Sequence, residues 1–302
     1  MPAPHPLTGL AMLPVGDEVE AARRACEELR WHRALRRQWA VARAEAGVRA
    51  AHAGAVLEGV RVPLEHVRDL ARGAGTAPDG AAGTVLLGAV RAQAVVEGLM
   101  AAPGSTARRA PVPFRQLLAR LHVAVVGGAA GGAGEHGRRP GGAVGRPRRG
   151  EPLDLRGLGP APAPEEVDAR LDVLAAVVDA ASSPAVPGVV LAAVAHGELL
   201  ALRPFEHGNG LVARAVFRHL LVREGVDAVG VVVPEVRWVA EPLPYVATAA
   251  RFATGTADGV AAWVRWCAGS VVRGAEEGTA LADAVLAGRL DRGRAGAGGA
   301  RT

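Results

Sequence analysis

The sequence predicts an all-α protein. Apolar residues recur at helical spacing in successive segments, most clearly in residues 114–126 and in the segment that Pro164 opens with two glutamates in its first turn. Half of the residues are hydrophobic but only 3% are aromatic, so the core must be built from Leu, Val and Ala. One segment, residues 231–238, has the composition of a strand, but Pro234 would restrict that strand to a sheet edge.

The predicted helices follow one another along most of the chain. Acidic residues open residues 17–53, which we expect to form one long helix or two in succession. Pro63 suits the first position of a helix that reaches residue 70. Helical spacing also predicts helices over residues 84–100, 114–126, from 164 onward, 186–202 and 257–272. Two glycine-rich segments, residues 127–150 and 288–302, carry too little apolar surface to pack, so we expect a mobile loop and a disordered tail.

Composition argues against several classes of function. The net charge of +5 comes from local arginine clusters in residues 138–149 and 289–301, without interleaved aromatic residues, which disfavours a nucleic-acid partner. The apolar stretches are interrupted by charged residues, so no membrane span is expected. The two cysteines, Cys26 and Cys267, lie far apart and match no metal spacing, and no basic segment opens the chain. We therefore expect a reduced, cytoplasmic setting.

Residues 203–214 carry the strongest functional signal. They read Arg-Pro-Phe-Glu-His-Gly-Asn-Gly-Leu-Val-Ala-Arg and contain Asn209, the single asparagine of a chain without lysine or isoleucine. Glycines let the backbone approach an anion closely, and asparagine tolerates left-handed dihedral angles. A helix N-terminus adds oriented N–H groups and a partial positive charge. The segment therefore predicts a phosphate cradle at the start of an apolar helix.

The same stretch resembles the signature of the Fic (Fido-fold) family, His-Pro-Phe-x-Asp/Glu-Gly-Asn-Gly-Arg-x-x-Arg. Most members of that family transfer AMP from ATP to a protein hydroxyl. The positions that agree are Pro204, Phe205, Gly208, Asn209, Gly210 and Arg214. Three positions depart: Arg203 replaces the family's histidine, His207 replaces its acidic residue, and Leu211 replaces its first arginine.

Two further segments support this resemblance. Glu58 and Gly59 match the end of the inhibitory-helix motif that some Fic proteins carry, although the hydroxyl residue of that motif is absent. In such proteins the glutamate pairs with the second motif arginine, which is Arg214 here. Residues 145–167 stand where the family has its substrate-facing flap, so the resemblance implies a short β-hairpin near residues 146–160.

The resemblance also implies a domain organisation. A Fido-like helical core is expected over residues 106–270. An N-terminal helical region with the inhibitory-type Glu-Gly segment precedes it over residues 1–105. A C-terminal helix and disordered tail follow over residues 271–302.

The three departures bear directly on chemistry. Arg203 cannot act as a general base near neutral pH, because the pKa of arginine exceeds about 12. Imidazole is a poor ligand for Mg²⁺, so His207 disfavours that ion and we expect no metal site. Leu211 removes one charge that would neutralise phosphate. Gly208, Asn209, Gly210 and Arg214 are left as a nucleotide-binding set, with ATP or another nucleotide as the expected ligand and Glu58 as the expected inhibitory residue.

Several alternatives stay open from the sequence. The Gly-Asn-Gly turn could simply cap a helix, Arg214 could be a surface residue, and Glu58 an exposed one. Three functions follow: a nucleotide- or phosphate-binding relative of protein AMP transferases with weak or lost activity; an active transferase with reassigned residues, such as His207 as base; or a non-catalytic helical module that binds a protein target or regulator.

Overall fold

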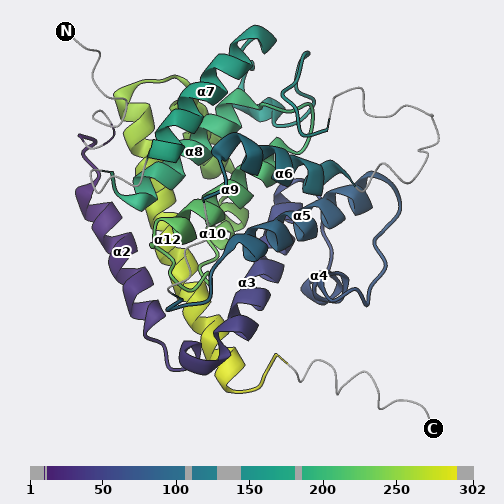
Figure 1. The fold of residues 1–302 in the computed structure, drawn as a ribbon, viewed down its shortest axis with the longest axis vertical. Coiled ribbons are helices and arrows are strands. Elements are labelled where there is room, and N and C mark those ends of the chain that lie inside the picture. The colour runs from purple at the N-terminus through teal and green to yellow at the C-terminus, as the bar shows by residue number, and fades with distance from the viewer. Residues whose placement is uncertain (1–9, 11, 106–110, 128–143, 181–185, 291–302) are drawn as a thin grey trace.

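The computed structural model describes residues 10, 12–105, 111–127, 144–180 and 186–290, and these residues fold into packed helices without any strand. The all-α prediction is confirmed (Figure 1). The α-helices are α2 (Gly16–Arg30), α3 (Leu35–Leu57), α4 (Leu64–Ala71), α5 (Gly80–Leu99), α6 (Phe114–Val126), α7 (Pro164–Ala180), α8 (Gly188–Leu202), α9 (Asn209–Arg223), α10 (Glu235–Ala240), α11 (Pro242–Ala253) and α12 (Ala257–Leu286).

The centre of the fold is the pair α8 and α9. Both are buried along nearly their whole length, and α9 also packs against α3, α5 and α6. The close approach of α8 to α11 and α12 depends on Gly197, where a Cβ atom would lie 2.6 Å from Trp263 Nε1. Since α9 begins with the Gly-Asn-Gly turn, this packing fixes the start of α9 firmly in the core.

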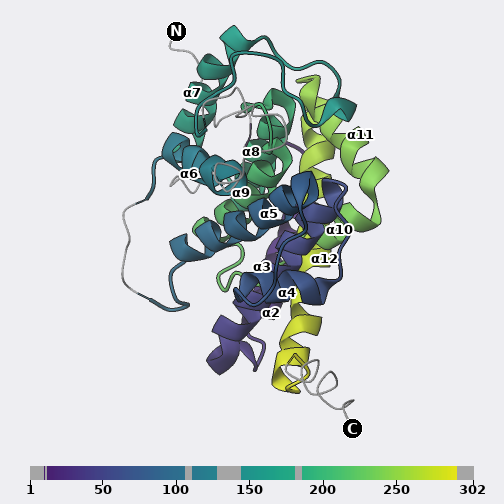
Figure 2. The same cartoon turned by 90° about the vertical axis from the view of Figure 1, so that its right-hand side faces the viewer.

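The surrounding helices form a shell around that pair. In Figure 1 the long helix α12 runs the height of the molecule, and α2 packs along it. Figure 2 shows α3 and α5 on the side of the molecule that also carries α4, with α6 and α7 above them. The helix α3 ends at Leu57, so it delivers Glu58 to the inner part of the fold.

Among the described residues one helix, α5, is long and apolar enough to cross a membrane. The expectation was that charged residues interrupt every such stretch, and α5 does not meet it. It packs against α3, α6 and α9, and the buried core helices of globular domains often share its composition.

Two predicted β segments are wrong. Residues 231–233 are buried but pair with α12, through Val233 N–H donating to the Gly274 carbonyl, and Pro234 caps helix α10. Residues 144–160 follow an irregular path with one 3-10 turn, η2 (Arg156–Leu158), in place of the expected hairpin. The physical reason for this second difference lies in the buried arginine contacts of the segment, described below.

The remaining differences concern boundaries. Residues 17–53 form two helices, α2 and α3, one of the two arrangements that the sequence allowed. Helix α11 was not predicted, and α12 continues without a break through residue 270, where the sequence analysis ends the core. Most of the expected mobile loop, residues 128–143, and of the expected tail, residues 291–302, lies outside the described residues.

Candidate functional site

Two left-handed residues shape the loop between α8 and α9. Arg203 ends α8 with a φ of 47°, and Gly208 precedes α9 with a φ of 78°. Glycine adopts such angles without steric cost, whereas a residue with a side chain does so only when its surroundings hold it. The loop therefore turns sharply twice, and the second turn aims the first N–H groups of α9 out of the helix.

Asn209 organises this loop and also binds a carboxylate. Its Oδ1 accepts a hydrogen bond from Phe205 N–H, and its Nδ2 donates to the Phe205 carbonyl, both at 2.8 Å. Its backbone N–H donates to Asp154 Oδ2 at 2.8 Å, and Nδ2 donates to Asp154 Oδ1 at 2.7 Å. The donors at the start of α9, where the sequence predicted a phosphate cradle, thus bond a carboxyl group of the same chain.

Arg214 is buried one helical turn further along α9. Its guanidinium forms an ion pair with the Glu58 carboxylate through Nη2 and Oε1, so the predicted contact between these two residues is confirmed. Burial is the largest single effect and lowers the pKa of Arg214, but the charges and hydrogen bonds of Glu58 and Tyr245 together outweigh it, so the pKa is raised. Arg214 is therefore a charged core residue and not a surface arginine.

Gly210 gives Glu58 room to reach the arginine. A Cβ atom at residue 210 would collide with Glu58 Oε1.

Arg214 also contacts Tyr245, whose hydroxyl bonds His196 Nε2 at 3.0 Å. Burial lowers the pKa of His196 well below its usual range, which fits the core histidine that the sequence analysis expected.

The Arg203 side chain is buried against residues 144–163, which we call the flap segment. Its Nη1 donates to the carbonyl of Gly159 at 2.8 Å and to that of Leu155 at 3.3 Å. Arg148 is also buried and donates to the carbonyls of Arg203 and Pro162, at 2.8 and 2.6 Å. Two arginines therefore hold this segment through backbone oxygens. These contacts do not follow the ladder of a hairpin, which explains why the hairpin prediction is wrong.

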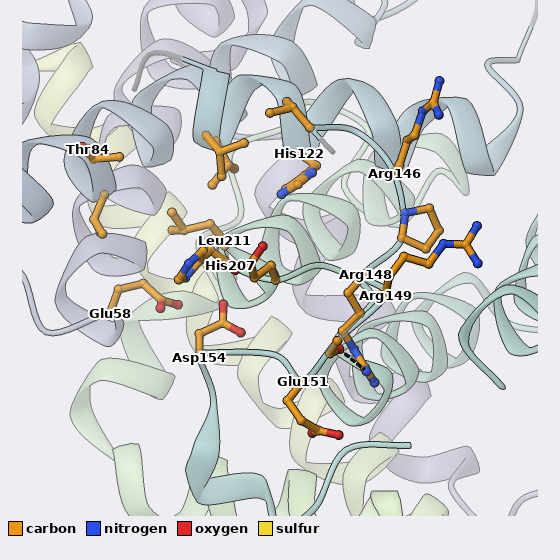
Figure 3. Close-up of a pocket in the computed structure, with 18 of the residues that line it drawn as sticks. Glu58, Thr84, His122, Arg146, Arg148, Arg149, Glu151, Asp154, His207 and Leu211 are labelled. Atoms are coloured by element: carbon orange, nitrogen blue, oxygen red, sulfur yellow. Dashed lines mark hydrogen bonds between the residues drawn. The ribbon is translucent and has the colours of Figure 1, made fainter. Parts of the chain in front are cut away.

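A cavity of about 960 Å³ opens beside the start of α9. Its lining includes Glu58 at the end of α3 and residues from α5, α6, the flap segment and the loop before α9. Figure 3 shows the Glu58 and Asp154 carboxylates on one side of this cavity, with His207 and Leu211 close to them. His207 is exposed in the cavity, whereas Leu211 is buried in its wall. The inner end of the cavity is consequently apolar and acidic.

The outer side of the cavity has the opposite charge. Arg146 and Arg149 line it and lie across the cavity from Glu58 in Figure 3. His122 on α6 lies between the two sides, with Nδ1 accepting a hydrogen bond from Gly145 N–H at 2.9 Å. Its ring stacks on Phe205 with 3.9 Å between centroids. Burial lowers the pKa of His122 to about 4, so the imidazole is neutral at pH 7.

The donor set does not suit Mg²⁺. Within the described part of the chain, no three His, Cys, Asp or Glu residues are grouped so as to hold a metal ion. The Glu58 carboxylate pairs with Arg214, and the Asp154 carboxylate bonds Asn209. Glu206 also lines the cavity.

Part of this site was predictable from the sequence. The fold brings the five predicted residues into one region: Arg203, His207, Asn209, Arg214 and Glu58. Asp154, Arg148 and His122 also belong to the site and were not predicted. Arg148 lies in an arginine-rich run that was read as a mobile loop, and only the fold distinguishes it from its exposed neighbours. No sequence pattern singles out Asp154 among the acids of the flap segment.

Comparisons with known proteins agree with this arrangement. The model of the Fic/DOC family matches residues 115–221. No curated protein matches the chain. A Fic family protein from Desulfovibrio desulfuricans G20 is similar over 88% of this chain and 74% of its own, with a TM-score of 0.68 and 18% identity.

Two other solved structures have the same fold. Fic-1 (residues 134–508) from C. elegans is similar over 87% of this chain and 71% of its own, with a TM-score of 0.63 and 19% identity. A Fic-domain signalling protein from Bacteroides thetaiotaomicron VPI-5482 is similar over 88% of this chain and 97% of its own, with a TM-score of 0.64 and 16% identity. The chain therefore contains a domain of the Fic/DOC family.

Proposed function

We propose that this protein recognises the phosphate groups of a nucleotide in the central cavity and does not carry out ordinary AMP transfer. The observation that carries the proposal is the buried pair of Arg214 and Glu58. A guanidinium paired with a carboxylate can exchange it for a phosphate, because the oxygens of both groups fit the same fork of N–H donors. Glu58 lines the cavity, so its displacement would open Arg214 to a ligand there.

Loss of transfer activity follows from the three replaced positions. Arg203 is buried among carbonyl groups and has no basic lone pair to accept a proton. His207 offers a poor ligand to Mg²⁺, and Leu211 adds no charge. A missing base costs roughly 10²–10⁴ in rate, and a missing electrostatic stabiliser roughly 10²–10³. The losses are not additive, but each lowers the rate.

A second function deserves a test because of one observation. His207 is exposed in the cavity and acts electrostatically on Asp154, although burial is the largest effect there and raises the pKa of that carboxyl. A histidine beside a carboxylate is a common arrangement for a general base. A transferase with His207 as base would differ from the preferred function by showing turnover that depends on this residue.

Ligand binding is tested by thermal denaturation of the purified protein with ATP, ADP and pyrophosphate, with and without Mg²⁺. The wild type is compared with Glu58→Gly and with the double variant Glu58→Gly/Arg214→Met. We expect nucleotide to raise the melting temperature most in Glu58→Gly and not in the double variant. Equal behaviour of all three proteins, without any ligand effect, would favour the non-catalytic interaction module.

Activity is tested with labelled ATP, Mg²⁺ and a mixture of candidate protein acceptors. We expect no labelling above background by the wild type, including self-modification. Restoring Arg203→His, His207→Asp and Leu211→Arg together, with Glu58→Gly, should produce measurable labelling if the cradle is otherwise intact. Strong labelling by the wild type that disappears in His207→Ala would establish the second function instead.

A further inference from the structure

Asp154 occupies the position at the start of α9 where an anionic ligand would bind. Its two oxygens accept hydrogen bonds from the Asn209 backbone N–H at 2.8 Å and from Asn209 Nδ2 at 2.7 Å. The partial positive charge of the helix N-terminus adds to this attraction. A carboxylate and a phosphate present comparable oxygen atoms to such donors, so the two compete for one place.

Asp154 and Glu58 hold two separate donors. Asp154 takes the donors of Asn209, and Glu58 takes the guanidinium of Arg214. Gly210, which lies between Asn209 and Arg214 in the sequence, is beside the Glu58 carboxylate. The two carboxylates are near enough that the charge of Glu58 raises the pKa of Asp154, although burial is the larger cause. Together they make the inner end of the cavity repel a polyphosphate.

The backbone around Asp154 is held in place by its surroundings. The next residue, Leu155, has a left-handed φ of 54°, which a residue with a branched side chain rarely adopts unless contacts hold it there. Two of those contacts are the hydrogen bonds that Arg203 donates to Leu155 and Gly159. The hydrogen bond from Leu153 N–H to the Glu206 carbonyl, 2.9 Å long, fixes the other side of Asp154. Because the backbone at Leu155 is strained, we expect the flap segment to shift when one of these contacts is removed.

We propose that Asp154, on the flap segment, is a second carboxylate latch beside Glu58. A latch here means a carboxylate that occupies the donors a ligand phosphate would use: those of Asn209 for Asp154, and those of Arg214 for Glu58. This inference rests on the proposed function, since it assumes that the cavity takes phosphate groups. Phosphate binding then requires Asp154 to leave Asn209 as well as Glu58 to leave Arg214. Removal of either carboxylate alone gives a partial gain in affinity, and removal of both gives the full gain.

The test measures the affinity of pyrophosphate and of ATP by isothermal titration calorimetry. The proteins are the wild type, Asp154→Ala, Glu58→Gly and the double variant. Glu151→Ala is the matched control, because Glu151 belongs to the same segment and also lines the cavity, yet it bonds no donor of α9 among the described contacts. Asp154→Asn, which keeps the shape of the side chain and loses its charge, serves if Asp154→Ala proves unstable.

We expect pyrophosphate to bind Asp154→Ala about tenfold more tightly than the wild type, and the double variant more tightly than either single variant. Glu151→Ala should bind as the wild type does. If Glu58→Gly gains affinity while Asp154→Ala and Asp154→Asn both stay within twofold of the wild type, the second latch is overturned and the proposed function stands. If no variant binds pyrophosphate or ATP, both the second latch and the proposed function are overturned.

Hydrogen exchange of the Asn209 amide gives an independent readout. In the wild type this N–H is bonded to Asp154 and should exchange slowly. In Asp154→Ala it should exchange faster, and saturating pyrophosphate should slow it again. Slow exchange in Asp154→Ala without any ligand would overturn the assignment of Asp154 as the occupant of this position.

Discussion

Arg203 and Arg214, the first and last residues of the motif segment, are both buried, but they have chemically different partners. Arg203 is 3% exposed and Arg214 is 2% exposed. Arg214 faces a carboxylate, that of Glu58. Among the described residues, the Arg203 guanidinium donates to carbonyl groups of the flap segment, those of Leu155 and Gly159.

This difference divides the motif into a fixed part and an exchangeable part. Backbone carbonyls cannot leave Arg203 unless the flap segment itself refolds. A carboxylate on a side chain can leave Arg214 by a change of rotamer, which is what the proposed function requires. The first half of the motif therefore acts as a scaffold, while the second half keeps the charge that would bind a phosphate under the proposed function.

The largest effect is expected at Arg214. Arg214→Met leaves the partly buried Glu58 carboxylate, 15% exposed, without its partner, which should lower the free energy of unfolding by about 3 kcal/mol, the lower end of the range for a broken buried pair. Urea denaturation of Arg214→Met, Glu58→Gln and the double variant forms a thermodynamic cycle. We expect the double variant to be more stable than Arg214→Met. Strictly additive losses would contradict a direct interaction between the two charges.

The next effect concerns pH and the packing of the first half of the motif. His122 stacks on Phe205, and burial lowers its pKa to about 4. An unfolded histidine has a pKa of about 6.5, so between pH 6.5 and 4 the unfolded state takes up a proton that the folded state refuses. The free energy of unfolding should fall through this window as the pH falls, by up to roughly 3 kcal/mol from this group.

His122→Asn isolates this contribution. The asparagine keeps a hydrogen-bond acceptor near the Gly145 N–H but does not titrate. Urea denaturation of both proteins at pH 7 and pH 4.5 should show a smaller loss in the variant. His219, whose pKa burial also lowers to about 4, contributes equally to both proteins and drops out of the difference. Parallel losses in the two proteins would show that His122 is not buried as neutral imidazole.

A smaller effect is expected at Arg203. Arg203→Met removes the donors to Leu155 and Gly159 but leaves neutral acceptors behind, not a charge. The free energy of unfolding should fall by about 1–3 kcal/mol, less than for Arg214→Met. Limited proteolysis should cut the flap segment faster in the variant. A loss as large as that of Arg214→Met would remove the distinction between scaffold and exchangeable charge.

The sequence predicted the helices well because their apolar spacing is a local property. It also predicted the contact of Glu58 with Arg214, through a resemblance in which both positions carry known roles. It could not predict the flap segment, because the path of residues 144–160 depends on buried contacts of Arg148 and Arg203 with backbone carbonyls. Those contacts join parts of the chain about 50 residues apart, and no periodicity encodes them.

The same reasoning explains the Asn209 result. The sequence predicted a phosphate cradle at this asparagine, because glycines and a helix start favour an anion, and that prediction stays open. Asp154, which bonds Asn209, comes from a segment with several acids, and only the fold shows which of them reaches the helix. The prediction of a strand at residues 231–233 was wrong for a related reason. Their apolar composition indicates burial, but composition does not distinguish burial against a helix from burial in a sheet.

The smallest effect is expected at an exposed pair that has the same chemistry as Arg214 and Glu58. Arg115 on α6 donates to Asp172 on α7 at 2.9 Å, but the Asp172 side chain is 70% exposed. Water solvates both charges in the folded and the unfolded states, so the pair gains little on folding. Asp172→Asn should change the free energy of unfolding by less than about 1 kcal/mol, and by still less at high salt. Urea denaturation at two salt concentrations measures both values. If Asp172→Asn cost as much as Arg214→Met, ion pairing alone would explain the stability of the Arg214 contact, and burial would contribute nothing to it.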